Sequence, residues 1–181
     1  MKNVLCILTN GFEEIEAIGT FAILRRGNVN VDLTSLRNTP LVGRYGLNIT
    51  NLQNTNEIDF NKYDSLFIAG GPQYAELENN EIFLNIINKF YKSNKMIAAI
   101  CAGPTILGKL GLLKNRNYTC FNSMDENFGG TYIDKYVVRD GNIITGKSAA
   151  ATIEFAFTYL EALTDKENAE NIKQQVYYYN K

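Results

Sequence analysis

Histidine is absent from the 181-residue chain. This absence excludes the Ser-His-Asp triad, the Cys-His dyad and every zinc site that needs an imidazole ligand. Any acid–base chemistry must therefore be performed by carboxylates, tyrosines or a thiol. The restriction narrows the range of possible functions more than any other feature of the composition.

The chain also lacks an excess of either charge. Eighteen basic and nineteen acidic side chains give a formal net charge of -1, so no overall field attracts nucleic acid or an anionic membrane. No apolar run approaches the roughly 18 residues that a membrane span needs. Residues 1–9 are apolar but lack a small-residue cleavage site, and we expect a strand there and not a signal peptide.

Cysteine is scarce. Cys6, Cys101 and Cys120 are too few and too widely spaced for a disulfide framework or a metal cluster. We therefore expect a reducing, cytoplasmic location, no metal and no other cofactor. Free cysteine is among the most buried residue types, so Cys6 and Cys120, each inside or ending a predicted strand, are assigned to the core.

Apolar β-branched runs alternate with longer stretches of helical periodicity, which is typical of an α/β sheet built from β-α-β units. Length and a hydrophobic content of 45% fit one domain over residues 1–181. The pattern predicts strands at 4–8, 29–36, 65–69, 96–100 and 118–120, helices at 13–26, 82–91, 102–113, 149–163 and 166–176, a hairpin of 135–138 with 142–145, and a hairpin or excursion at 42–51.

Three predicted loops are expected to meet at one edge of this sheet. Ligand sites in open parallel sheets form beyond the carboxyl ends of the strands. Residues 10–16, 70–72 and 101–104 each follow a predicted buried strand. We therefore place the candidate site where these loops converge.

Cys101 lies at the junction of a predicted strand and a predicted helix, with small residues on both sides, and this is the layout of a nucleophile elbow. A lone cysteine after an apolar run is more often core, but this position favours function. The positive end of the following helix would lower the pKa of the thiol. The backbone N–H groups of Gly71 and Ala102 together form a candidate oxyanion hole.

Glu16 is the candidate proton carrier for this cysteine. An acidic first turn, here with Glu13, Glu14 and Glu16, is usually only a helix cap. Glu16 differs because it can point back along the helix toward the carboxyl edge of the sheet. Burial beside a sulfur would raise its pKa, and a protonated Glu16 would donate a hydrogen bond to the thiolate.

Three segments, taken in order and spacing, resemble the ThiJ/PfpI superfamily. They are Glu-Glu-Ile-Glu at 13–16, Ala-Gly-Gly at 69–71 and Ala-Ala-Ile-Cys-Ala-Gly-Pro at 98–104. Within the superfamily they are similar to the branch of the parkinsonism-associated protein deglycase and its bacterial relatives. The resemblance covers nearly the whole chain.

The resemblance implies a flavodoxin-like three-layer α/β/α sandwich with a mostly parallel sheet, and a homodimer. It makes Cys101 the reactive cysteine and Glu16 the glutamate that hydrogen-bonds it, with Gly71 and Ala102 as the backbone donors. It also puts Arg26 and Arg44 where relatives carry arginines near the pocket and the dimer interface, so both are candidate anion-binding residues; a solvated helix end and a loop charge are the alternatives.

Three departures from the superfamily pattern bear on function. Peptidase-like members carry histidine immediately after the cysteine, where this chain has Ala102, and proteolysis is therefore disfavoured. Some relatives also carry histidine where Phe121 stands, which leaves this pocket more apolar. The loop at 146–150 replaces an arginine-glycine-proline-glycine type loop, so the shape of the pocket there is left open.

Three functions remain open at this point. In the first, the Cys101 thiolate adds to a small 2-oxoaldehyde or glycated substrate, Glu16 moves a proton between carbons, and water releases a hydroxy acid. In the second, oxidation of Cys101 to a sulfinate makes the protein a redox sensor. The third is a holdase chaperone, which needs an exposed apolar patch.

Overall fold

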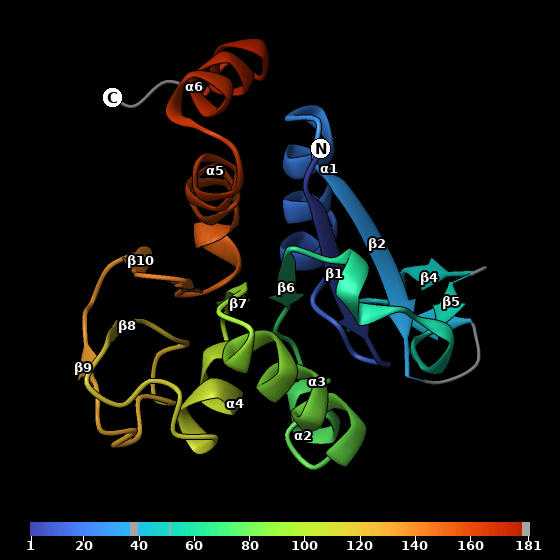
Figure 1. The fold of residues 1–181 in the computed structure, drawn as a ribbon, viewed down its shortest axis with the longest axis vertical. Coiled ribbons are helices and arrows are strands. Elements are labelled where there is room, and N and C mark those ends of the chain that lie inside the picture. Colours follow the sequence, from blue (N-terminus) through green and yellow to red (C-terminus); the bar gives the residue numbers. More distant parts are fainter. Residues whose placement is uncertain (37–39, 51, 179–181) are drawn as a thin grey trace.

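The structure is a computed structural model that describes residues 1–36, 40–50 and 52–178. Asn51, the last residue of the predicted excursion at 42–51, lies outside the described residues. In the described part, seven strands form the main sheet in the order β10-β11-β7-β6-β1-β2-β5 (Figure 1). Their bounds are β1 Asn3–Leu8, β2 Asn30–Ser35, β5 Gln53–Asn54, β6 Ser65–Ile68, β7 Met96–Ile100, β10 Val137–Asp140 and β11 Ile143–Gly146.

All neighbouring strands in this sheet are parallel except β10 and β11, which form the predicted hairpin. The five strands β2, β1, β6, β7 and β11 follow the flavodoxin-like order 2-1-3-4-5 when they are counted along the chain. β5 and β10 extend the sheet at its two edges. The predicted mostly parallel α/β sandwich is therefore confirmed.

Helices cover both faces of the sheet (Figure 1). One face carries the π-helical turn η1 Ile15–Gly19, α1 Thr20–Arg26, the 3₁₀ turn η4 Ala149–Ala151, α5 Thr152–Leu163 and α6 Lys166–Gln175, and the other carries α2 Tyr74–Leu77, α3 Glu81–Lys92 and α4 Gly103–Lys109. Among the described residues, no helix is both long enough and apolar enough to cross a bilayer.

The alternation of side chains along β1 explains the two apolar layers. Val4, Cys6 and Leu8 pack with residues of α1 and α5, whereas Leu5 and Ile7 pack with residues of α3 and α4. A strand buried on both faces must be apolar throughout, which is why its sequence reads as a continuous run. Cys6 and Cys120 are both fully buried, which confirms their assignment to the core.

α3 shows how local sequence fixes a helix and its orientation. The Asn80 side chain caps the helix by accepting a hydrogen bond of 3.0 Å from the backbone N–H of Phe83. Phe83, Ile86, Ile87 and Phe90 recur at helical spacing and are all buried against the sheet. The helix therefore begins near the carboxyl edge of β6 and returns the chain to the amino end of β7.

Several short elements differ from the sequence-based prediction. The helix predicted at 13–26 begins as the π-helical turn η1, and the strand predicted at 118–120 is β8 Asn117–Tyr118, paired with β9 Thr131–Tyr132 outside the main sheet. The excursion predicted from 42 forms β3 Leu41–Val42 and β4 Asn48–Ile49, an antiparallel pair. β5, β9, α2 and the 3₁₀ turns η2 Thr55–Glu57 and η3 Phe60–Lys62 were not predicted, because segments this short carry almost no periodicity.

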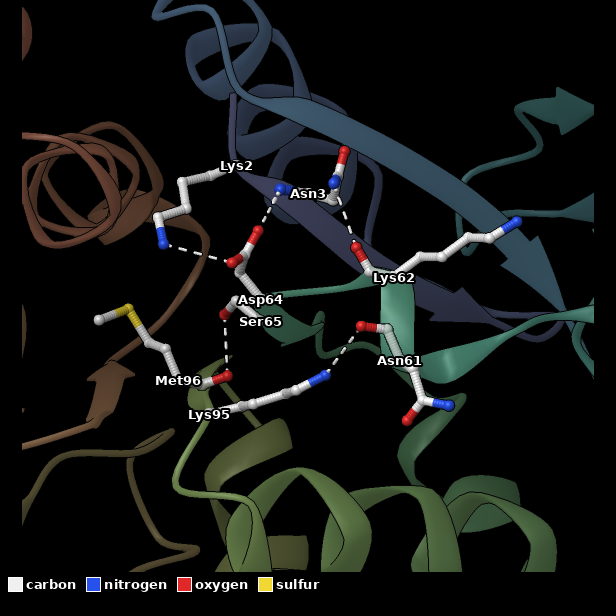
Figure 2. A network of polar contacts seen from close by, with 8 residues as sticks. All are labelled: Lys2, Asn3, Asn61, Lys62, Asp64, Ser65, Lys95 and Met96. Carbon is white, nitrogen blue, oxygen red and sulfur yellow. Dashed lines mark hydrogen bonds and ion pairs between the residues drawn. The ribbon is translucent and has the colours of Figure 1, made fainter.

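A polar network ties together the amino ends of the central strands (Figure 2). The Asp64 carboxylate accepts a 2.8 Å hydrogen bond from the backbone N–H of Asn3 and pairs with Lys2 at 3.2 Å. The Ser65 hydroxyl donates to the Met96 carbonyl at 2.8 Å. β1, β6 and β7 are thus joined by side chains at the edge opposite the three candidate loops.

Candidate active site

The three predicted loops meet at the carboxyl edge of the main sheet. Glu16 comes from η1 after β1, Gly70 follows β6, and Cys101 follows β7. The Glu16 Oε2 atom accepts a hydrogen bond of 2.8 Å from the backbone N–H of Gly70. A Cβ atom at Gly70 would lie 2.7 Å from both the Cys101 Cβ and the Glu16 Oε2 atom, so only glycine lets the carboxyl and the cysteine approach this closely.

Cys101 adopts a backbone conformation that side-chain-bearing residues rarely adopt. Its φ is 63° at the turn between β7 and α4. Such a conformation costs about 1 to 3 kcal/mol and persists where the surroundings enforce it. Two hydrogen bonds do so here: the Cys101 N–H donates to the Gly146 carbonyl at 2.9 Å, and the Cys101 carbonyl accepts from the Phe121 N–H at 2.8 Å. The strand–turn–helix geometry expected at this cysteine is therefore present.

Glu16 is fully buried, and the π-helical turn explains its direction. A π-helix holds more residues per turn than an α-helix, so its side chains leave the axis at different angles. The Glu13 carboxylate accepts the Glu16 N–H at 2.8 Å, which supplies a partner at the start of this turn. The Glu16 Oε1 atom is buried, and the Glu16 side chain also hydrogen-bonds with Cys101.

Burial raises the pKa of Glu16 to about 7, although hydrogen bonds with the Cys101 side chain and the Gly70 N–H act to lower it. The predicted rise of this pKa is confirmed. The expectation for the cysteine is wrong, because burial and then the negative charge of Glu16 raise the pKa of the Cys101 thiol. The N–H groups of Ala102 and Gly71 act on the sulfur in the opposite direction without overcoming these two effects. The direction of the shift at Cys101 is thus opposite to the one that the helix N-terminus alone predicts.

A pocket of about 340 Å³ opens onto the cysteine. It is lined by Arg44, Gly71, Pro72, Tyr74, Ala75, Cys101, Ala102, Phe121 and Met124. Among the described residues, Arg44 is the only charged one in this lining, and its charge acts to lower the pKa of Glu16. Among residues 1–36, 40–50 and 52–178, no group of three or more cysteine, aspartate or glutamate side chains could hold a metal ion.

The two candidate arginines lie in different places. Arg44 borders the pocket, whereas Arg26 is exposed in the last turn of α1. Ten residues separate Arg26 from Glu16 along η1 and α1, a distance of roughly 15 Å at the rise of an α-helix. Within one chain, Arg44 therefore lines the same pocket as Cys101, whereas Arg26 lies away from it.

Glu14 has a role that the sequence did not indicate. Its Oε1 atom accepts hydrogen bonds from the backbone N–H groups of Tyr45, at 2.7 Å, and Leu47, at 3.5 Å. A side chain at Gly43 would collide with this carboxylate. The hairpin of β3 and β4 is thereby fixed against the η1 loop, and the Arg44 N–H donates to the Phe12 carbonyl at 2.9 Å. Glu14 thus holds the segment that carries Arg44, although an acidic first turn by itself predicted only a helix cap.

The sequence profile of the DJ-1/PfpI family matches residues 2–162. The chain belongs to the DJ-1/PfpI family. It is 31% identical over 163 residues to the glutathione-independent glyoxalase DJR-1.2 of Caenorhabditis elegans, with 88% of this chain and 87% of that protein covered. It is 29% identical over 147 residues to the deglycase PfpI of Pyrococcus furiosus, with 80% and 89% covered.

A solved structure agrees with this assignment. The crystal structure of a cysteine-to-alanine mutant of a DJ-1 superfamily protein from Salmonella typhimurium superposes with a TM-score of 0.93 at 31% identity, covering 99% of this chain and 100% of that one. The resemblance inferred from the three motifs is confirmed at the level of family and fold. Relatives in this family carry both glyoxalase and deglycase names.

Proposed function

We propose that the protein is a cysteine-dependent enzyme that converts small 2-oxoaldehydes, free or as early adducts, into 2-hydroxy acids. One observation carries the proposal: a buried Glu16 carboxyl lies beside Cys101, hydrogen-bonds with it and has a pKa of about 7. A general acid–base group works best when its pKa is near the working pH. The glyoxalase and deglycase names of relatives support the same class of reaction.

The first step forms a bond between sulfur and carbon. Because the pKa of the Cys101 thiol is raised, the Glu16 carboxylate takes the thiol proton as the sulfur attacks the aldehyde carbon. The aldehyde oxygen becomes negative in this step. In this proposal the N–H groups of Gly71 and Ala102, which act on the sulfur, also stabilise that oxygen. Return of the proton to the oxygen gives a neutral hemithioacetal and regenerates the Glu16 carboxylate.

The second step moves hydrogen between the two oxidised carbons. Glu16 removes a proton from the former aldehyde carbon and delivers a proton to the neighbouring carbonyl carbon, while the hydroxyl proton passes to the neighbouring oxygen. The aldehyde carbon is oxidised and the ketone carbon is reduced within one molecule, which leaves a thioester of a 2-hydroxy acid. Water then cleaves the thioester and restores the thiol, so water is the only co-reactant.

The two arginines receive separate roles in this proposal. Arg44, at the pocket, binds the carbonyl oxygen of the substrate and the carboxylate of the product. Arg26 requires a second copy of the chain. Exposed apolar side chains at Ile15, Val42 and Leu47 lie around η1 and its hairpin, and a second copy that covers this face would bring its own Arg26 closer to the pocket than a single chain does. Light scattering that finds a monomer at working concentration would contradict this homodimer.

A redox sensor is the second candidate, and it is favoured by the position of the sulfur. Cys101 is only partly buried and opens onto the pocket, whereas Cys6 and Cys120 are fully buried. A sulfinate at Cys101 would accept hydrogen bonds from the Ala102 and Gly71 N–H groups and from a protonated Glu16. Because both functions use the same residues, substitutions alone do not distinguish them. The formation of product does, since only the enzyme turns over substrate.

The deciding experiment follows lactate formed from methylglyoxal by the purified protein. Cys101→Ala and Glu16→Gln are each expected to reduce kcat/KM at least about 100-fold, the usual contribution of an acid–base or nucleophilic group. Cys6→Ala and Glu161→Gln are the matched controls, since they make the same changes outside the pocket, and both are expected to retain activity. Activity that survives Cys101→Ala refutes the proposal. Absence of lactate, with ready formation of a Cys101 sulfinate in dilute peroxide, supports the sensor instead.

A further inference from the structure

The pocket at Cys101 is larger than the smallest 2-oxoaldehydes require. Its volume of about 340 Å³ falls in the range of roughly 300 to 1,000 Å³ in which proteins hold drug-sized ligands. Methylglyoxal has only three carbons. The remaining volume leaves room for a larger substituent, and the chemistry of the lining residues indicates which kind would bind there.

The wall beside the cysteine is apolar. Phe121 and Met124 come from the segment after β8, and Pro72 and Ala75 come from the segment after β6. The Phe121 side chain is 44% exposed, which is high for a large apolar ring that borders a pocket. Apolar surface left open to water beside a reactive group gains free energy when an apolar ligand covers it.

The apolar wall is fixed relative to the sulfur. The Phe121 N–H donates to the carbonyl of Cys101 itself, and the Met124 N–H donates to the Phe121 carbonyl at 3.1 Å. Phe121 and Met124 therefore sit on one turn that is bonded directly to the reactive residue. A thioether adapts its shape to flat or branched groups, so Met124 accommodates either kind of substituent.

We infer that the preferred substrates are 2-oxoaldehydes whose ketone carbon carries an apolar group larger than methyl, such as phenyl or isobutyl. The inference rests on the proposed function. The aldehyde carbon meets the Cys101 sulfur, and the apolar group lies against Phe121 and Met124. The chemical steps are those given above, because the substituent takes no part in bond making or breaking; phenylglyoxal gives mandelate as methylglyoxal gives lactate.

The test compares kcat/KM for phenylglyoxal and methylglyoxal in the same protein. A ratio at least about 10-fold in favour of phenylglyoxal is expected, because one extra methylene in an apolar pocket already changes kcat/KM about 10- to 200-fold. Intrinsic reactivity differs between the two aldehydes, so the decisive quantity is the change of this ratio between variants. Phe121→Ala should lower the ratio about 10-fold, and Phe121→Leu, which keeps an apolar side chain, should lower it less.

Phe60→Ala is the matched control. It removes the same ring from η3, which precedes β6 and lies outside this pocket, and it is expected to leave the ratio unchanged. Turnover of both aldehydes with the same ratio in wild type and Phe121→Ala overturns the inference and leaves the proposed function standing. Failure of the wild-type protein to form either lactate or mandelate overturns the proposed function itself.

Discussion

Replacement of Glu16 by glutamine is expected to remove a pH-dependent loss of stability. The pKa of Glu16 is raised from its ordinary value of 4.5 to about 7, chiefly by burial. The folded protein therefore binds this proton more tightly than the unfolded chain does. The free energy of unfolding of the wild-type protein should fall as the pH rises from 4.5 through 7, and the fall should level off above that range. At 1.36 kcal/mol per pH unit, the shift corresponds to about 3 kcal/mol.

The variant keeps the local structure that the comparison needs. The glutamine oxygen can still accept a hydrogen bond from the Gly70 N–H, which donates to Glu16 at 2.8 Å in the wild type. The amide does not titrate, so the ionisation of Glu16 is absent from the variant. The difference between the two proteins consequently isolates Glu16 from the other carboxyl groups.

Urea unfolding at intervals from pH 4.5 to 8 measures this difference. Glu16→Gln should become more stable relative to wild type by about 3 kcal/mol across the range. Glu161→Gln, at an exposed position on α5, should show a constant difference. The same comparison in a Cys101→Ala background shows whether the carboxyl or the thiol titrates. A Glu16→Gln difference that stays constant from pH 4.5 to 8 refutes the reasoning, because Glu16 would then ionise as an exposed glutamate does.

Two further expectations follow from the geometry around the cysteine. Gly70→Ala puts a methyl group 2.7 Å from both the Cys101 Cβ and the Glu16 Oε2 atom. Lactate formation should therefore fall at least about 100-fold, and the free energy of unfolding in urea should fall by about 1 to 3 kcal/mol. Activity near that of the wild type would contradict the proposed contact. Alkylation by iodoacetamide should modify Cys101 first in the native protein, and Cys6 and Cys120 only after unfolding, since both are fully buried. The alkylation rate at Cys101, followed by mass spectrometry, should keep rising above pH 8 because the pKa of the thiol is raised. A rate that already stops rising by pH 7 would contradict this raised pKa.

The main sheet was predictable because its central strands are buried on both faces. β1, β6 and β7 appear in the sequence as uninterrupted apolar runs, each followed by a loop with glycine or another small residue. Parallel strands bring those loops to one edge, so the meeting of Glu16, Gly70 and Cys101 follows from topology. Two-residue strands such as β5 and β9 were missed because they pair through backbone atoms, with too few side chains to leave a pattern.

The electrostatics of the site were harder to predict than its composition. Helix-dipole reasoning anticipated a lowered thiol pKa, but it contains no information about how much solvent the fold removes from the sulfur. Desolvation reverses the sign at Cys101 and also produces the predicted rise at Glu16. The positions of Arg26 and Arg44 depend similarly on tertiary structure, since hydrogen bonds of the β3–β4 hairpin to the loop after β1, including those to Glu14, bring Arg44 to the pocket.

The polar network around Lys2, Asp64 and Ser65 bears on how this protein tolerates change. The carboxyl edge combines a cysteine in the left-handed backbone conformation with a buried carboxyl, and both features lower stability. The amino edge carries none of these features in the network described, and its hydrogen bonds join β1, β6 and β7 away from the reaction. Substitutions at the carboxyl edge that change the substrate should therefore be tolerated better while this network at the opposite edge is intact, because it stabilises the sheet independently of the site.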